Sequence, residues 1–378
     1  MLNLTAEQEM LVETLTDLAE KEFADNAFEW DGIPWENVEL LADRGFMGLN
    51  FSEEYGGGGM TEFEAMLMVE AIGRVCPDTS EFVMGQHMIA PRAVEMFGSE
   101  EAKQRYLPEV IDGGLNIALA MSEPGAGSDL KSMETEVTEE DGQLLLNGEK
   151  MWMTNGPESD VTVVWTKFPE GFGSAIIEMD DPGVEINQHY TNMAGDEQTH
   201  FFMNDVPIRE ENILTRGPDA FKEQLKGLNW ERLGSAIQIT ALGRNALEKA
   251  LDYADDRTQF DQPLNEFQGI EWKLADMAKQ LMAARTLTYT SAQTAVDQGR
   301  VPDPLQTQIA KLYAAEAVDE IVDESLQIHG ANGYQQGHPL EYLYRFVRGH
   351  RIAGGTDEIM KNTIAKRLKR DGFPPIVE

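Results

Sequence analysis

Two segments in the first half of the chain combine glycine, small hydroxyl and aromatic side chains at spacings that suit a large anionic cofactor. In the first, Ala118–Asp129 (ALAMSEPGAGSD), an apolar run ends at Met121 and is followed by Ser122, Gly127 and Ser128. Glycine allows the backbone to approach a ligand closely. Serine hydroxyls and free backbone N–H groups bind phosphate or ring heteroatoms. The composition favours a cofactor-binding turn, although similar turns join many strands that bind nothing.

The second segment, Asn147–Gly156 (NGEKMWMTNG), places Trp152 and Thr154 two residues apart. Side chains at this spacing on a strand point to the same face, so the indole can pack against a flat ring while the hydroxyl reaches its edge. A single tryptophan is more often a core residue, but the pairing of the two segments favours the cofactor. Together the segments resemble the flavin-binding face of the acyl-CoA dehydrogenase family, and further matches extend the resemblance along nearly the whole chain.

The resemblance implies FAD as the cofactor. It implies that Thr154 contacts flavin N5, that Ser122 binds the ring and that Ser128 binds the pyrophosphate. The implied contacts of the two segments are Met121, Ser122, Gly127, Ser128, Trp152 and Thr154.

Three segments in the second half of the chain resemble further FAD-binding motifs of the family. They are Arg257–Phe260 (RTQF) with Gln268, Gln327–Tyr334 (QIHGANGY) and Gly354–Ile359 (GGTDEI). An arginine suits pyrophosphate because its planar fork donates two parallel hydrogen bonds. The resemblance implies FAD contacts by Arg257, Phe260, Gln268, Gln327, Gly330, Thr356 and Glu358. In the family a neighbouring subunit usually supplies some of these contacts, which implies a homotetramer or at least a homodimer.

Three positions depart from the family pattern. Asp261 follows Phe260 where a glycine is usual, and Ala331 replaces one glycine of the second motif. Phe346 follows Arg345 where the family usually has an aspartate that could form a local salt bridge.

The family reaction removes the α-proton of an acyl-CoA thioester while the β-hydride passes to flavin N5, and it needs a carboxylate base. Many members place this glutamate immediately before the last Gly-Thr pair, where this chain has Gly354. Another group, including the isovaleryl- and long-chain-type enzymes, carries it in a Glu-Arg pair at the start of a helix, where this chain has Glu231 and Arg232. Glu231 is therefore the predicted base. The alternative is a solvated glutamate favoured by the helix dipole.

Two neighbours complete the predicted catalytic set. Arg232 is expected to order the substrate side, with a structural or surface ion pair as the alternative. The backbone N–H of Gly354 is expected to polarise the thioester carbonyl together with the ribityl hydroxyl of FAD. Losing a donor of this kind typically costs about 10²–10³ in rate. The six histidines form no metal-ligand pattern, so no metal is expected.

The resemblance implies an FAD-dependent acyl-CoA dehydrogenase of fatty acid β-oxidation, which passes its electrons to an electron-transferring flavoprotein. A flavin monooxygenase or an acyl-CoA desulfinase on the same scaffold is the alternative. Those relatives tend to lack a base at both glutamate positions, so Glu231 counts against them. A non-enzymatic flavin- or CoA-binding protein is a third possibility, which the intact set of Thr154, Glu231 and Gly354–Thr356 disfavours.

The order of elements is helical, β, helical. Residues 1–115 read as helices, opening with a capping box of Thr5 and Gln8. Short β-prone runs separated by turn clusters occupy 116–218 and predict a small antiparallel barrel or sandwich. The helical period returns in 219–378, with breaks at 302–304 and 329–339. The predicted class is a mostly helical α+β multidomain protein, with an N-terminal helical domain, a middle β domain and a C-terminal four-helix bundle.

Composition limits the partners and the location. The net charge of −37 argues against nucleic acid or an anionic membrane surface as a partner. Scarce lysine beside abundant acid favours a halophilic protein over an ordinary acidic one. Cys76 is the only cysteine, and the N-terminus has no secretory pattern, so a cytoplasmic location is expected. No run approaches the roughly 20 apolar residues that span a bilayer.

Overall fold

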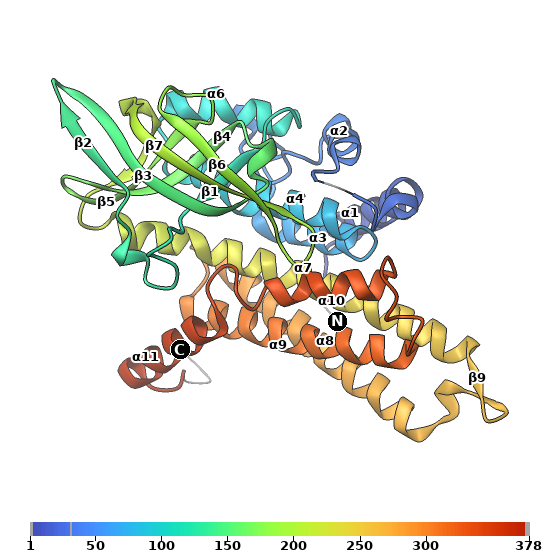
Figure 1. The fold of residues 1–378 in the computed structure, drawn as a ribbon. Coiled ribbons are helices and arrows are strands. Elements are labelled where there is room, and N and C mark those ends of the chain that lie inside the picture. The colour runs from blue at the N-terminus through green and yellow to red at the C-terminus, as the bar shows by residue number, and fades with distance from the viewer. Residues whose placement is uncertain (1–2, 31, 375–378) are drawn as a thin grey trace. The chain divides into compact units, whose positions relative to one another are not determined.

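The computed structural model describes residues 3–30 and 32–374 (Figure 1). Within it the chain forms two compact units, each assembled from separated stretches of sequence. Unit 1 comprises Met1–Phe28, Met66–Ser80 and Arg232–Glu378, and unit 2 comprises Glu29–Ala65 and Glu81–Glu231. The predicted fold class is confirmed, because a helical N-terminal part, a middle sheet and C-terminal helices follow one another along the chain. The boundaries after residues 115 and 218 stay predictions.

Unit 2 contains an eight-stranded sheet. Seven of its strands follow the order β6-β7-β3-β2-β4-β5-β8, and the eighth, β1, pairs with β4. The strands are β1 (Ile117–Ala120), β2 (Glu136–Glu140), β3 (Gln143–Thr154), β4 (Val161–Phe168), β5 (Gly171–Glu178), β6 (Val184–Thr191), β7 (Glu197–Ile208) and β8 (Ile213–Arg216). The sheet is mixed, since β1 and β2 both pair with β4 in parallel. The purely antiparallel prediction was wrong because β1 joins the sheet from the preceding helical segment and not through a hairpin. Every β4 residue except Lys167 is buried, which accounts for its apolar run.

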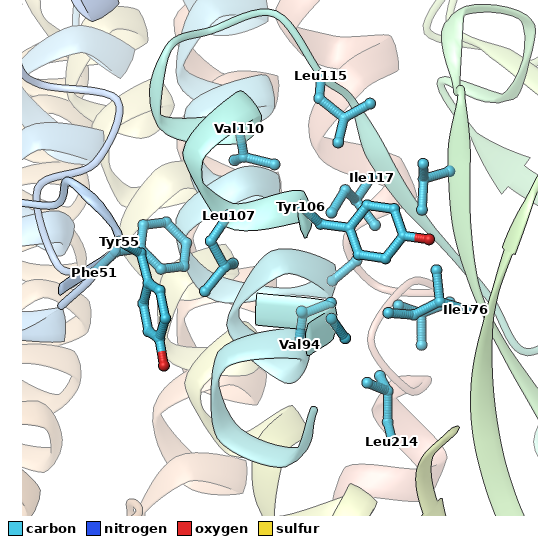
Figure 2. Close-up of a cluster of buried hydrophobic side chains, with 14 residues drawn as sticks. Phe51, Tyr55, Val94, Tyr106, Leu107, Val110, Leu115, Ile117, Ile176 and Leu214 are labelled. Atoms are coloured by element: carbon cyan, nitrogen blue, oxygen red, sulfur yellow. The ribbon is translucent and has the colours of Figure 1, made fainter. Parts of the chain in front are cut away.

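The core of unit 2 joins this sheet to short helices. They are α5 (Ala90–Phe97) and α6 (Glu100–Ile111), and unit 2 also contains α2 (Trp35–Asp43). Figure 2 shows Val94 of α5 and Leu107 of α6 between Phe51 on one side and the strand residues Ile117 and Ile176 on the other. Each is at most 2% exposed, and full burial of such a side chain contributes about 1.5–3 kcal/mol. The packing fixes the helix that lines the cavity described below.

Three helices run from one unit into the other. They are α3 (Glu62–Gly73), α4 (Pro77–Met88) and α7 (Ala220–Asp256). The change of unit within α7 falls between Glu231 and Arg232. The predicted Glu-Arg pair therefore has one member in each unit.

Unit 1 is helical apart from one small hairpin. Its remaining helices are α1 (Ala6–Leu18), α8 (Gln268–Asp297), α9 (Pro304–His329), α10 (Pro339–Gly349) and α11 (Asp357–Asp371), and the hairpin strands are β9 (Thr258–Gln259) and β10 (Gln262–Pro263). Helix α9 contacts α8, α10 and α11. A buried polar contact also joins α3 to α8, where the Tyr289 hydroxyl donates to Glu70 at 2.7 Å. No helix in the described part of the chain is long and apolar enough to cross a membrane.

Helix starts and stops follow local chemistry. The capping box is confirmed: the Gln8 N–H donates to the Thr5 hydroxyl at 3.2 Å, and the Thr5 N–H donates to the Gln8 side chain at 2.9 Å. The predicted break at 302–304 separates α8 from α9, with the Asp303 carboxylate capping the new helix and Pro304 as its first residue.

Candidate active site

The two predicted cofactor-binding segments, 118–129 and 147–156, lie side by side in unit 2. The Met151 N–H donates to the Ser122 carbonyl at 3.0 Å. The Lys150 ammonium donates to the Met121 carbonyl at 3.1 Å. Strand β3 therefore holds the start of the glycine-containing loop.

A buried ion pair fixes this loop. Lys150 is 0% exposed, and its Nζ lies 2.7 Å from a carboxylate oxygen of Glu123, which also accepts the Thr135 N–H at 3.1 Å. Burial lowers the pKa of Lys150 to about 8, against the opposing effect of the Glu123 charge. Burial opposes ionisation of Glu123, but hydrogen bonds from the Glu134 N–H and from Lys150 hold its pKa below the usual value. Sequence reasoning gave neither residue a role, although both lie inside the two motifs.

Past Glu123 the loop makes a tight turn and then becomes accessible. Backbone hydrogen bonds run both ways between Glu123 and Ala126, at 3.0 and 3.1 Å. Ser122 is half-buried, whereas Gly127 and Ser128 are exposed. Backbone N–H groups and a hydroxyl beside glycine fit a phosphate-bearing ligand.

Trp152 and Thr154 are both exposed and flank the buried Met153. The indole is 49% exposed and lies 5.1 Å from the Tyr190 ring, measured between centroids. The strand is irregular here, since its register with β7 shifts between Lys150 and Met153 and Trp152 has a φ of +63°. A bulky residue in this left-handed region costs of order 1–3 kcal/mol, and such residues cluster at ligand sites. The accessible aromatic face and hydroxyl fit the flat ring system of FAD.

Glu231 lines a cavity that lies wholly within unit 2, with an empty volume of about 430 Å³. The residue is 9% exposed, and the cavity wall is mostly apolar. Helices α4, α5 and α7 and strands β1, β4 and β5 contribute to it; Ile89, Phe97, Leu119, Trp165 and Leu228 are among its apolar members. Glu231 is therefore the one carboxylate among the described residues that line this cavity.

In unit 1, buried cations hold the glycine segment before α11. The Arg232 Nε donates to the Gly354 carbonyl at 2.9 Å, and Arg232 is 8% exposed. Lys311 is 0% exposed and donates to the carbonyls of His350 at 2.6 Å and Gly355 at 3.0 Å. Gly354 and Gly355 have φ values of +65° and +102°, which glycine adopts without strain. Arg232 is thus an ordering residue for this turn.

His350 completes that arrangement. Its Nδ1 lies 3.0 Å from the Ser235 hydroxyl. Burial, with added repulsion from Lys311, lowers the pKa of His350 to about 3. The imidazole is therefore neutral at physiological pH.

The remaining predicted FAD residues of unit 1 occupy accessible positions. Thr356 also caps α11, accepting the Ile359 N–H at 3.3 Å, a structural role that sequence reasoning missed. Exposed residues of this set are Arg257, Phe260, Gln268, Gln327, Gly330 and Glu358. Their assignment to FAD stays a prediction.

Two of the three departures from the family pattern, Asp261 and Phe346, have local explanations. Phe260 and Asp261 form the turn between β9 and β10, with φ values of +52° and +67°. Two such residues define the tight hairpin turn that matches strand twist, and aspartate tolerates it better than most. Phe260 is 91% exposed at this tip. Arg345 pairs instead with Glu341 at 2.6 Å, and Phe346 is buried beside Tyr342.

Comparison with known proteins defines the class. Residues 5–114, 118–206 and 221–369 match the N-terminal, middle and C-terminal domains of acyl-CoA dehydrogenases. The chain belongs to the acyl-CoA dehydrogenase family. It is an FAD-dependent oxidoreductase that acts on acyl-CoA.

Individual relatives catalyse different reactions. Acryloyl-CoA reductase (NADH) of Anaerotignum propionicum is 32% identical, over 97% of this chain and 96% of the relative. A 3-sulfinopropanoyl-CoA desulfinase of Advenella mimigardefordensis is 30% identical, over 99% of this chain and 98% of the relative. The structure of butyryl-CoA dehydrogenase from Megasphaera elsdenii is similar with a TM-score of 0.91 and 29% identity, over 98% of this chain and 100% of that chain.

Proposed function

We propose that this protein catalyses the α,β-desaturation of an acyl-CoA thioester, with Glu231 as the base that removes the α-proton. The observation that carries the proposal is the placement of the Glu231 carboxylate in the wall of a mostly apolar cavity. FAD, when bound, accepts the β-hydride.

The turn at Gly354 supplies the second element of the proposal. Arg232 fixes the Gly354 carbonyl, and Lys311 fixes the two carbonyls on either side. A peptide held in this way can present its N–H to a thioester carbonyl, which raises the acidity of the α-C–H. Arg232 and Lys311 thus act on the substrate through the backbone that they position.

The reductase and desulfinase relatives use the same scaffold for other reactions. Glu231 supports dehydrogenation for this chain, because a desulfinase tends to lack a base at both glutamate positions. By the same resemblance we propose an electron-transferring flavoprotein as the acceptor, a homotetramer or homodimer as the assembly, fatty acid β-oxidation as the process and the cytoplasm as the location.

Anaerobic titration of the FAD-bound protein with acyl-CoA thioesters tests the proposal. Loss of flavin absorbance with one acyl class, together with the enoyl-CoA product, is the expected result. Full retention of oxidised flavin with every thioester, or release of sulfite from a sulfinopropanoyl thioester, would contradict it.

A further inference from the structure

The cavity beside Glu231 contains one polar side chain that its surroundings do not satisfy. Gln224 is 5% exposed and lines the cavity. Its amide oxygen and amide nitrogen are both buried, and neither has a hydrogen-bond partner among residues 3–30 and 32–374. A buried polar group without a hydrogen-bond partner destabilises the folded protein. An amide with both atoms open is suited to a ligand that both accepts and donates a hydrogen bond.

The position of Gln224 defines where that ligand group lies. Gln224 and Glu231 are seven residues apart on α7, which places them on the same helix face and about 10 Å apart along the axis. A base approaches its proton donor, and an amide its hydrogen-bond partner, at roughly 3 Å each. For side chains that extend in parallel from the helix, about 4 Å then remains between the α-carbon and the polar atom, the span of roughly three bonds.

The charges around the cavity disfavour a negatively charged group on the ligand. Arg92 also lines the cavity, but its two terminal nitrogens pair with Glu62 and Glu95. The Arg92 charge is thus already compensated by two carboxylates outside the lining, and Glu231 adds a negative charge in the wall, so a substrate carboxylate or sulfinate would be repelled.

Two further polar groups belong to residues of the wall. The Ser174 hydroxyl lies 3.3 Å from that of Thr215 and lines the same cavity. The Arg92 Nε is buried and has no hydrogen-bond partner in the described part of the chain. Both add capacity for an uncharged oxygen.

We propose that the substrate is a short acyl-CoA whose acyl chain carries an uncharged hydroxyl or carbonyl group about three bonds beyond the α-carbon, and that Gln224 selects it. The proposal rests on the dehydrogenase function proposed above. Gln224 is a specificity-determining residue: it binds the distal group and takes no part in proton or hydride transfer.

A matched set of thioesters tests this directly. In 4-hydroxybutyryl-CoA a hydroxyl replaces the terminal methyl of valeryl-CoA, and glutaryl-CoA carries a carboxylate at the same end. For the wild type we expect kcat/KM for 4-hydroxybutyryl-CoA to exceed that for valeryl-CoA by about tenfold or more, with glutaryl-CoA the poorest. For Gln224→Leu we expect the order of the first two to reverse, because the distal hydroxyl loses its hydrogen-bond partner.

The outcomes separate the two proposals. Equal use of 4-hydroxybutyryl- and valeryl-CoA, or a preference that Gln224→Leu leaves unchanged, means that the amide is satisfied by water and overturns the specificity proposal alone. A preference for glutaryl-CoA overturns it as well. Oxidised flavin with all three thioesters, together with reduction by some other acyl-CoA, also overturns the specificity proposal alone. Oxidised flavin with every acyl-CoA tested contradicts the dehydrogenase function itself. Should Gln224→Leu fail to bind FAD, Gln224→Met, which keeps the side-chain volume, takes its place in the same comparison.

Discussion

The Nε of Arg232 donates a 2.9 Å hydrogen bond to the carbonyl of Gly354, joining α7 to the turn that precedes α11. In many relatives the position of Gly354 carries the catalytic glutamate. Here the residue next to the alternative glutamate, Glu231, holds the backbone at that vacated position. Two adjacent residues of α7 thus have different roles: Glu231 is the proposed base, and Arg232 holds the turn at Gly354.

Replacing Arg232 should therefore slow the reaction while leaving FAD bound. Because misplacing a catalytic donor by about 1 Å can cost 10²-fold, we expect Arg232→Gln to lower kcat about 10²-fold with a smaller change in KM. Arg232→Lys should retain part of the rate. The control is Arg244→Gln, twelve residues later on α7 in an exposed ion pair. A purely structural role would instead lower stability and leave kcat of the folded fraction unchanged.

The buried pair of Lys150 and Glu123 should stabilise the FAD loop. Lys150→Met leaves the Glu123 carboxylate buried without its cation, which we expect to cost about 3–5 kcal/mol in unfolding free energy and to weaken FAD binding. The double variant with Glu123→Gln should recover much of the loss. Denaturant unfolding and FAD titration measure both effects, with Lys222→Met at an exposed site as the control. If Lys150→Met and Lys222→Met had the same unfolding free energy and the same FAD affinity, the buried pair would not stabilise the FAD loop.

The low pKa of His350 predicts acid sensitivity. An unfolded histidine titrates near 6.5, whereas His350 in the folded protein titrates at about 3, so the unfolded state binds the additional proton between these values. The stabilising contribution is thus complete above pH 6.5 and falls by up to about 1.4 kcal/mol per pH unit below it. His350→Gln should flatten this part of the unfolding free-energy profile, whereas His189→Gln at an exposed site should not. Parallel profiles for all three proteins would show that His350 is not the group responsible.

The charge of −37 predicts stabilisation by salt, as in a halophilic protein. Molar KCl shortens the screening length to about 3 Å and reduces repulsion among the acidic side chains. With FAD saturating, we expect the Tm to rise by about 5 °C or more from dilute to molar KCl. A Tm that stays constant or falls as KCl rises would contradict salt adaptation and favour an ordinary acidic enzyme.

Much of the fold was predictable because it depends on local patterns. The capping box of Thr5 and the break at 302–304 are short-range signals, and both occur as expected. Parallel pairing of β1 with β4 joins residues more than 40 positions apart, and no local pattern specifies it. The left-handed Trp152 likewise follows from a register shift against β7.

The site was predictable in its motifs and not in its supporting contacts. Glu231 stood out because Gly354 leaves the other base position empty. Glu123 and Lys150 both lie within the predicted motifs, but their ion pair is a buried tertiary contact that no local sequence pattern specifies. Gln224 could have been found only by asking which residues share a helix face with Glu231.

The most direct test of the central claim compares Glu231→Gln with Glu223→Gln, eight residues earlier on the same helix and paired with Lys226 at 2.8 Å. Each FAD-bound variant is mixed anaerobically with the best acyl-CoA substrate, and the rate of flavin reduction is recorded. We predict that Glu231→Gln binds the thioester but reduces flavin about 10²–10⁴-fold more slowly, while Glu223→Gln matches the wild type. Near-normal reduction in Glu231→Gln would contradict the account and place the base elsewhere.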